Sequence, residues 1–153
     1  MRISQETLDL RMHFFRSRCA EHGLSLTHQR WVIYRTLAGT VQHLTPEETF
    51  ERVRRDIPSI SLATIYKNIK TFLDVRLLKE VSSLRQTMRL DANLDPHCHF
   101  VCASCSTILD IAPDGVAPIQ LKKGLPKGFQ VVSYEVKFLG LCGQCSSRAH
   151  AAN

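Results

Sequence analysis

Two kinds of metal-binding side chain lie within residues 91–105. Asp91, His97 and His99 offer oxygen and nitrogen donors, and Cys102 and Cys105 offer sulfur. Thiolate ligands select zinc or iron–sulfur clusters, whereas imidazole with carboxylate suits iron, manganese or zinc. Because the two donor sets differ in chemistry, we expect this stretch to contribute to two different metal sites.

Four cysteines form two Cys-x2-Cys pairs, Cys102 with Cys105 and Cys142 with Cys145. Each pair can make a tight turn that presents both sulfurs to one ion, and two such turns complete a tetrahedral zinc site. Strands between the pairs would span the long gap that separates them. We expect structural zinc that contributes to folding. The alternatives are redox disulfides, free buried cysteines or an iron–sulfur cluster.

His97 and His99 alternate, so in a strand both imidazoles point to one side while Cys98 points to the other. Acidic residues flank them in strand-like sequence, and a further histidine stands in a loop directly before a predicted helix. The candidate regulatory ligands for Fe(II), Mn(II) or Zn(II) are His43, Asp91, His97, His99 and Asp110. The alternative is that two surface histidines alternate by chance.

Four helices are predicted in the first half of the chain. Apolar residues at helical spacing predict a helix over residues 5–22, and Thr27 caps a second over 28–38. Thr45-Pro46-Glu47-Glu48 is a capping box that starts a third. Ser61 caps a fourth, whose predicted buried stripe is Leu62, Ile65, Ile69 and Phe72.

The fourth helix has a polar face suited to DNA. Small residues allow close approach, hydroxyls and amines can hydrogen-bond, and an aromatic ring can contact a thymine methyl. The candidate DNA-binding residues are Ser61, Ala63, Thr64, Tyr66, Lys67 and Lys70. A basic helix after a short polar link is typical of a helix-turn-helix, although the same spacing suits any small helical bundle.

After Asp74 the apolar residues recur with a period of two, which is typical of strands. Residues 78–81 and 87–90 read as a hairpin, the wing of a winged helix, with Arg85 and Arg89 as candidates for phosphate contacts. We predict a DNA-binding domain over 1–85, a hinge over 86–92 and a second domain over 93–153. That second domain has predicted strands at 99–101, 107–111 and 130–139, a short helix at 116–123 and a frayed tail around His150. The fold class is α+β.

Charge follows the same division. Residues 1–90 hold 15 Lys and Arg against 9 Asp and Glu, a net +6, and residues 91–153 hold 5 against 5. An excess of positive charge in the cysteine-poor half fits a DNA-facing domain, although a solvated basic surface would look alike. The sequence has no membrane-length apolar run and no apolar signal core at its start, so we expect a cytoplasmic protein whose cysteines bind metal.

These motifs together resemble the ferric uptake regulator (Fur) family, and within it the peroxide-sensing branch. The resemblance extends from about Leu24 to Cys145. It is carried by Leu-Thr-His-Gln-Arg at 26–30, His-Leu-Thr-Pro-Glu-Glu at 43–48, Ile-Ser-Leu-Ala-Thr-Ile-Tyr-Lys-Asn-Ile at 60–69 and His-Cys-His-Phe-Val-Cys-Ala-Ser-Cys at 97–105. It implies a winged-helix domain, an α/β dimerisation domain, and a homodimer that binds operator DNA when metal is bound.

The resemblance also implies roles for single residues. It assigns structural zinc to the four paired cysteines, the regulatory ion to the five His and Asp ligands, and base contacts to Tyr66. Two departures, Ser25 where the family commonly has a basic residue and Lys67 where it has Arg, alter the expected DNA contacts.

Asp110 is the residue that separates the branches, because iron and zinc sensors of the family usually carry Glu there. In the peroxide sensors Fe(II) reacts with hydrogen peroxide, oxygen is added to a ligand histidine, metal is lost and repression ends. His43 and His97 match the oxidised positions, and the Mn(II) form represses without reacting. Two alternatives are a repressor that senses only metal, and a metalloenzyme. Five candidate ligands and no pocket signature disfavour an enzyme or any small-molecule substrate other than peroxide.

Overall fold

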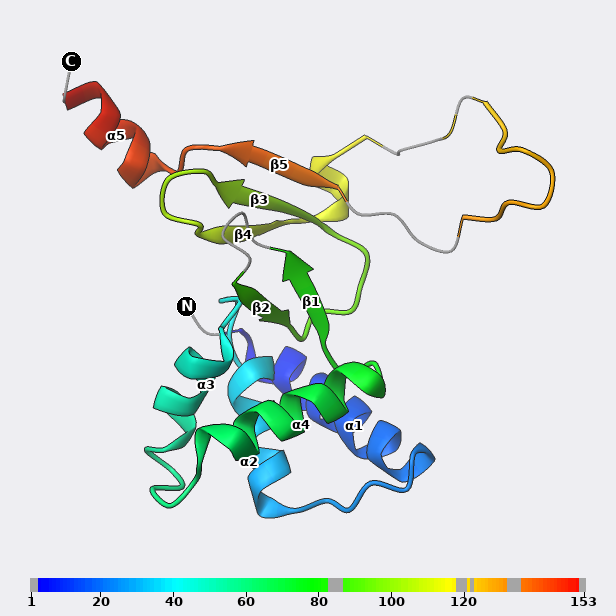
Figure 1. Ribbon diagram of the computed structural model, residues 1–153, viewed down its shortest axis with the longest axis vertical. Coiled ribbons are helices and arrows are strands. Elements are labelled where there is room, and N and C mark those ends of the chain that lie inside the picture. Colours follow the sequence, from blue (N-terminus) through cyan, green and yellow to red (C-terminus); the bar gives the residue numbers. More distant parts are fainter. Residues whose placement is uncertain (1–2, 83–86, 118–120, 122, 132–135, 152–153) are drawn as a thin grey trace. The chain divides into compact units, whose positions relative to one another are not determined.

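The computed structural model describes residues 3–82, 87–117, 121, 123–131 and 136–151. The chain divides into two compact units, Met1–Asp95 and Pro96–Asn153 (Figure 1). The first unit is helical with a two-stranded sheet, and the second contains a three-stranded sheet. The predicted α+β class, a winged helix-turn-helix followed by a small mixed domain, is confirmed.

The first unit begins with four helices, α1 (Gln5–Glu21), α2 (His28–Ala38), α3 (Pro46–Val53) and α4 (Leu62–Asp74). The predicted caps are in place at the last three. At α3 the capping box is complete, because the Glu48 N–H donates to the Thr45 hydroxyl at 3.1 Å and the Thr45 N–H donates to the Glu48 carboxylate at 2.9 Å. Glu47 follows Pro46 in the first turn of this helix.

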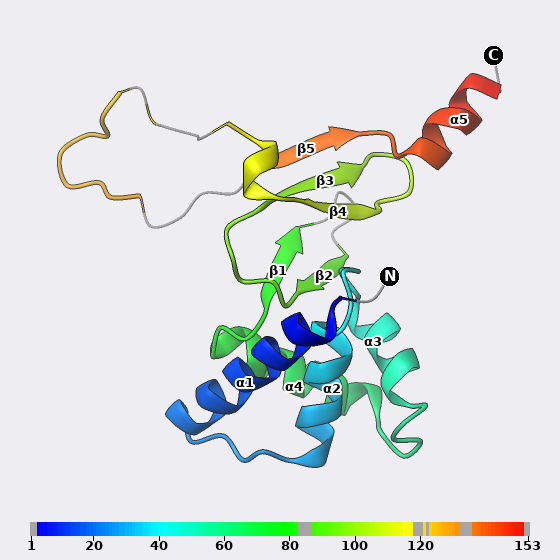
Figure 2. The same cartoon turned by 180° about the vertical axis from the view of Figure 1, so that it is seen from behind.

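An aromatic cluster holds three of these helices together. Phe15 of α1 stacks on Tyr34 of α2 with ring centroids 4.6 Å apart. Phe72 of α4 meets both rings edge-on, at 5.9 Å from Phe15 and 5.7 Å from Tyr34. All three side chains are fully buried. Figure 2 shows the three helices that carry these rings, α1, α2 and α4, close together in the first unit.

The buried side of α4 differs from the predicted stripe at one position. Ile65, Ile69 and Phe72 are buried as expected, but Leu62 is 36% exposed because it lies in the first turn of the helix, beyond the packed core. Asn68, which was not in the stripe, is buried instead, and its side-chain amide donates to the Thr64 carbonyl at 2.8 Å. Tyr66, Lys67 and Lys70 are exposed on the other side of α4.

The wing is formed by β1 (Lys79–Ser82) and β2 (Met88–Asp91), which pair antiparallel. β2 occupies residues that we assigned to the hinge. Its Leu90 forms a β-bridge with Leu44, so this strand belongs to the first unit, and the two units divide between Asp95 and Pro96. The predicted phosphate contact of Arg85 lies outside the described residues.

In the second unit β3 (Cys98–Cys102) lies between β4 (Ile108–Ile111) and β5 (Lys137–Gly140). β4 pairs with β3 antiparallel and β5 pairs with it parallel. A 3-10 turn, η1 (Pro113–Gly115), follows β4. The last described element is α5 (Gly143–Ala151), a helix where we predicted a frayed tail. Ser146 N–H donates to the Cys142 carbonyl at 2.8 Å and starts that helix.

Two predicted elements of this unit differ from the structure. The strand predicted over 130–139 is described only from Lys137, since residues 130–131 are not in a strand and 132–135 lie outside the described residues. The helix predicted over 116–123 falls partly outside the described residues, and those that are described there are not helical. Among the described helices, none has both the length and the apolar character needed to cross a membrane.

Replacing Phe15 with Ala should lower the free energy of unfolding by about 3–5 kcal/mol, because it empties the centre of the aromatic cluster. Phe14→Ala is the matched control, since Phe14 is the adjacent residue and is 40% exposed; it should cost less than about 1 kcal/mol. Urea unfolding followed by the fluorescence of Trp31, the one tryptophan of the chain, measures both. Equal losses would contradict this account of the core.

Candidate metal centres and nucleic-acid interface

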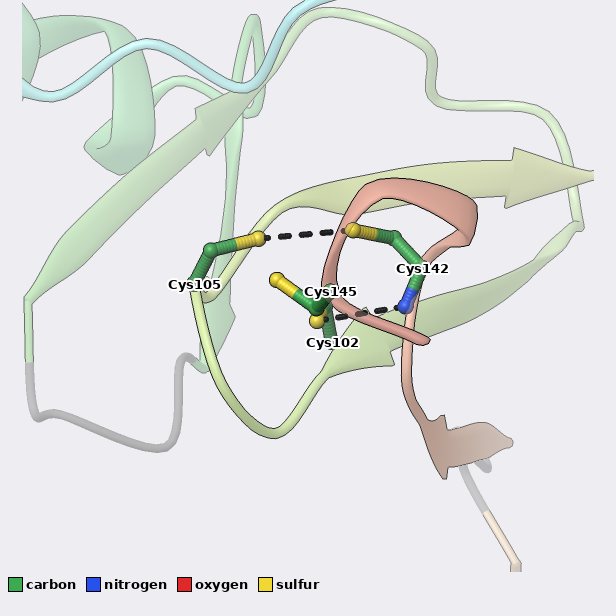
Figure 3. Close-up of side chains that lie close together, drawn as sticks. All are labelled: Cys102, Cys105, Cys142 and Cys145. Carbon is green, nitrogen blue, oxygen red and sulfur yellow. Dashed lines mark hydrogen bonds between the residues drawn. The ribbon is translucent and has the colours of Figure 1, made fainter. Parts of the chain in front are cut away.

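The four paired cysteines come together in the second unit. Cys102 ends β3 and Cys105 lies in the turn that follows, while Cys142 directly precedes α5 and Cys145 lies in its first turn. Their sulfur atoms all lie within 4.8 Å of one another. The Cys105 and Cys142 sulfurs are 3.7 Å apart, and Figure 3 shows all four side chains converging on one point. The prediction that two Cys-x2-Cys turns meet is therefore confirmed in geometry.

Hydrogen bonds favour the thiolate form of two of these cysteines. The pKa of Cys102 is lowered to about 6 because backbone N–H groups, those of Cys105 first and Cys142 next, donate to its sulfur. The Cys142 N–H lies 3.3 Å from that sulfur. The pKa of Cys105 is also lowered, mainly by the Thr107 hydroxyl at 3.1 Å. Metal ligation requires thiolates, so the groups around Cys102 and Cys105 favour it at these two positions. The pKa of Cys145 is instead raised to about 11, because the lowering effect of its hydrogen bond with Ser104 is outweighed by hydrogen bonds with the Cys142 and Cys105 sulfurs.

The dimensions of the cluster fit zinc. Sulfurs bound tetrahedrally at about 2.3 Å from Zn(II) lie about 3.8 Å apart. The Cys105–Cys142 separation of 3.7 Å matches that edge, and the widest separation exceeds it by only about 1 Å. Four sulfur donors around one point leave no position for substrate, which is the arrangement of a structural rather than a catalytic zinc site.

A second group of ligands in the same unit lies on the paired strands β3 and β4 and on the residue directly before β3. His97 and His99 direct their Nε2 atoms at one another, 2.9 Å apart. Asp110 of β4 lies opposite His99 in the strand register, and its Oδ1 is 3.6 Å from both Nε2 atoms. Donors bound at about 2.1 Å are separated by about 3.0–3.4 Å when the bond angles lie between octahedral and tetrahedral values. The triangle of two imidazoles and a carboxylate thus has the size of one face of a metal site.

The first unit contains the other two predicted regulatory ligands, side by side. His43 Nε2 is 3.8 Å from Asp91 Oδ2, and both side chains are buried. The β-bridge between Leu44 and Leu90 produces this pairing, because each ligand is the immediate neighbour of a bridged residue. Lys79 also reaches Asp91, with its Nζ 3.4 Å from the same oxygen. That lysine, which our sequence reasoning missed, lies opposite Asp91 in the β1–β2 register.

Arg89 has a structural position rather than the exposed one expected for a phosphate contact. Its guanidinium donates to the His43 carbonyl at 3.0 Å and to the Glu48 carboxylate at 2.8 Å. Because Glu48 also closes the capping box of α3, Arg89 links the backbone of a candidate metal ligand to the start of that helix.

The candidate DNA-binding residues lie together on the exposed side of α4. Ala63, Tyr66, Lys67 and Lys70 are exposed and Thr64 is half-buried. The Ser61 hydroxyl is engaged at the helix start, where it accepts a hydrogen bond from the Thr64 N–H at 3.1 Å. Tyr66 donates its hydroxyl proton to Glu47 of α3 at 2.5 Å. This contact lowers the pKa of Glu47 and raises that of Tyr66, so the carboxylate is ionised and the phenol protonated at neutral pH.

Residues 21–139 match the family model described as the ferric uptake regulator family. The chain belongs to this family. The peroxide-responsive repressor PerR of Staphylococcus aureus (strain Mu50 / ATCC 700699) is 30% identical over 126 residues, which cover 82% of this chain and 85% of that protein. The PerR protein of strain USA300 matches with the same identity and coverage.

Solved structures share the fold. The Helicobacter pylori ferric uptake regulator Fur, described as having three functional metal-binding sites, superimposes with a TM-score of 0.70 at 19% identity, covering 95% of this chain and 97% of that one. The Campylobacter jejuni peroxide stress regulator gives 0.63 at 23% identity, covering 88% and 98%. A zinc uptake regulator complexed with zinc and DNA gives 0.62 at 16% identity, covering 94% and 98%.

We expect the purified protein to carry one tightly held zinc per chain, and Cys102→Ser to lose it because the tetrahedral set is then incomplete. Cys98→Ser is the matched control, since Cys98 lies on the same strand but outside the cluster. Elemental analysis after gel filtration in a chelator measures the metal. Zinc that persists in Cys102→Ser, or is lost equally from Cys98→Ser, would contradict the assignment.

Proposed function

We propose that this protein is a metal-dependent transcriptional repressor that binds operator DNA as a homodimer and is inactivated by hydrogen peroxide. The observation that carries the proposal is the division of imidazole and carboxylate ligands between the two units. One group, His43 with Asp91, lies in the unit that contains α4, the candidate DNA-recognition helix. The other group, around His97 and His99, lies in the unit with the cysteine cluster.

Two ions have separate roles in this proposal. The four paired cysteines hold structural Zn(II). The regulatory ion, Fe(II) or Mn(II), takes ligands from both units, namely His43, Asp91, His97, His99 and Asp110. An ion shared in this way selects one arrangement of the two units from those available to the metal-free chain. His43 is the ligand that connects this choice to the DNA-binding unit.

DNA binding requires two copies of α4 in the dimer. Recognition helices of such dimers enter successive major grooves about 34 Å apart, so their spacing depends on how the units are held. The homodimer is supported by apolar side chains exposed on the sheet of the second unit, where Leu109 of β4 is 61% exposed and Phe138 of β5 is 41% exposed. Both residues lie opposite Phe100 of β3 in the strand register and therefore share one face of the sheet. An exposed apolar patch of this kind is typical of a subunit interface. A repressor acts on DNA, and we therefore place this one in the cytoplasm.

Peroxide sensing is supported by Asp110, the residue that distinguishes the peroxide-sensing branch in sequence, and by relatives named as peroxide-responsive. When bound at the regulatory site, Fe(II) supplies the electron transfer that activates peroxide. In the net reaction one oxygen of hydrogen peroxide is transferred to a ring carbon of His43 or His97, and the other leaves as water. The imidazole is oxidised by two electrons. Because each event consumes a ligand, the protein is a single-use sensor and not an enzyme.

The first test compares two metals. Protein loaded anaerobically with Fe(II) should release a DNA duplex, previously selected from a random library by the Mn(II) form, when peroxide is added. Peptide mapping by mass spectrometry should find one added oxygen on the peptides that contain His43 or His97. The Mn(II) form should keep both its DNA and its unmodified histidines, because Mn(II) does not activate peroxide in this way.

Asp110→Glu is the matched variant for this test, since it keeps the charge and the ligand type. We expect it to bind the duplex with metal but to be oxidised more slowly. Unmodified histidines and unchanged DNA binding in the Fe(II) form would instead indicate a repressor that senses metal availability alone.

The second test removes His43, a regulatory ligand that the DNA-binding unit contributes. His43→Ala should weaken Mn(II)-dependent binding to the selected duplex by more than about tenfold, because a regulatory ligand is lost. It should keep its zinc, measured by elemental analysis, and its dimer, measured by light scattering. His28→Ala is the control, as His28 is an exposed histidine of the same unit. Metal-dependent binding that survives in His43→Ala would disprove the coupling.

A further inference from the structure

We infer that Glu47 is a specificity-determining residue for DNA recognition, which positions Tyr66 and weakens binding to DNA of the wrong sequence. The inference rests on the proposed function, because it assumes that α4 reads DNA. Glu47 lies outside the metal ligands and outside the set of DNA-binding residues predicted from the sequence. Its hydrogen bond with Tyr66 connects it to those DNA-binding residues.

The contact joins two exposed side chains on different helices. Tyr66 is 43% exposed and projects from α4, and Glu47 is exposed in the first turn of α3. The Tyr66 hydroxyl donates to Glu47 Oε1. Neither side chain contributes to the buried core, so the contact adds little to stability. The hydrogen bond acts instead at the surface, where it orients the Tyr66 ring.

The carboxylate is held by a fixed piece of backbone. Thr45 caps α3, and Glu48, the neighbour of Glu47, is held both by that cap and by Arg89. A negative side chain in the first helical turn is also favoured by the helix dipole. Glu47 therefore projects from a fixed backbone position, and the hydrogen bond to its carboxylate restricts the orientation of the Tyr66 side chain.

The charge of Glu47 works against sequence-independent binding. Attraction of Lys and Arg to phosphates supplies essentially all of the affinity for non-specific DNA, and Lys67 and Lys70 on the same face provide such attraction. A carboxylate beside them reduces it. Glu47 also occupies the Tyr66 hydroxyl, which would otherwise be able to donate to any phosphate, and leaves the ring to contact a thymine methyl. The carboxylate therefore weakens binding to DNA of every sequence, whereas the contact of the Tyr66 ring strengthens binding only where a thymine methyl is present.

The test measures a ratio of affinities. A duplex is selected from a random library by the Mn(II)-loaded protein, and a scrambled duplex of equal length and composition serves as non-specific DNA. Fluorescence anisotropy then gives both affinities at several salt concentrations. We expect Glu47→Ala to tighten binding to the scrambled duplex, to leave or weaken binding to the selected one, and so to lower the ratio by about fivefold or more.

Glu51→Ala is the matched control. Glu51 lies on the same helix, carries the same charge and is also exposed, but it pairs with Arg54 and not with Tyr66. It should leave the ratio unchanged. Combining Glu47→Ala with Tyr66→Phe, which removes the hydroxyl and keeps the ring, should add no further loss on the selected duplex beyond that of Tyr66→Phe alone, because both changes break one contact.

The outcomes distinguish failure of the role inferred for Glu47 from failure of the proposed function. Equal effects of Glu47→Ala and Glu51→Ala, or an unchanged ratio in Glu47→Ala, would overturn the inference and leave the proposed repressor intact. Failure of the unaltered protein to select any duplex in a metal-dependent way would overturn the proposed function, and this inference with it.

Discussion

The short antiparallel contact between the loop before α3 and strand β2 is the constraint on which the first unit depends. Leu90 N–H donates to the Leu44 carbonyl at 3.0 Å, and Arg89 donates to the neighbouring His43 carbonyl. The same contact brings the His43 and Asp91 side chains together and sets where α3 begins. A metal ligand and the start of the helix that supports the DNA-reading face are therefore parts of one hydrogen-bonded structure.

Strand β3 has the corresponding role in the second unit. Among the described residues of this unit, the buried apolar side chains are Val101 and Cys102, both on β3. A unit of this size with so small a core is not expected to fold stably by burial alone. The cysteine cluster can supply the missing folding stability, because a bound ion would join the end of β3 to the start of α5. The zinc proposal thus accounts for the fold as well as for the cysteines.

Local signals in the sequence were sufficient for most of the first unit. Helix caps at Thr27, Thr45 and Ser61 and apolar spacing predicted α2, α3 and α4 within a few residues, because these features act over one or two turns. Contacts between distant residues were less accessible. Lys79 beside Asp91, and Glu47 beside Tyr66, depend on strand register and helix packing, which no local pattern records. Helix α5 was missed because it lacks an apolar stripe and an N-cap signature.

The shared strand also explains why the two ions should differ in permanence. His99 and Cys102 are three residues apart on β3, so their side chains leave the strand on opposite faces. The cysteine cluster joins two chain segments and is closed by four sulfurs, so releasing its ion would loosen β3 itself. His99 and Asp110 lie on strands already paired by backbone hydrogen bonds, and His97 directly precedes one of these strands. They can gain or lose an ion while the sheet persists, which is what an exchangeable regulatory site requires.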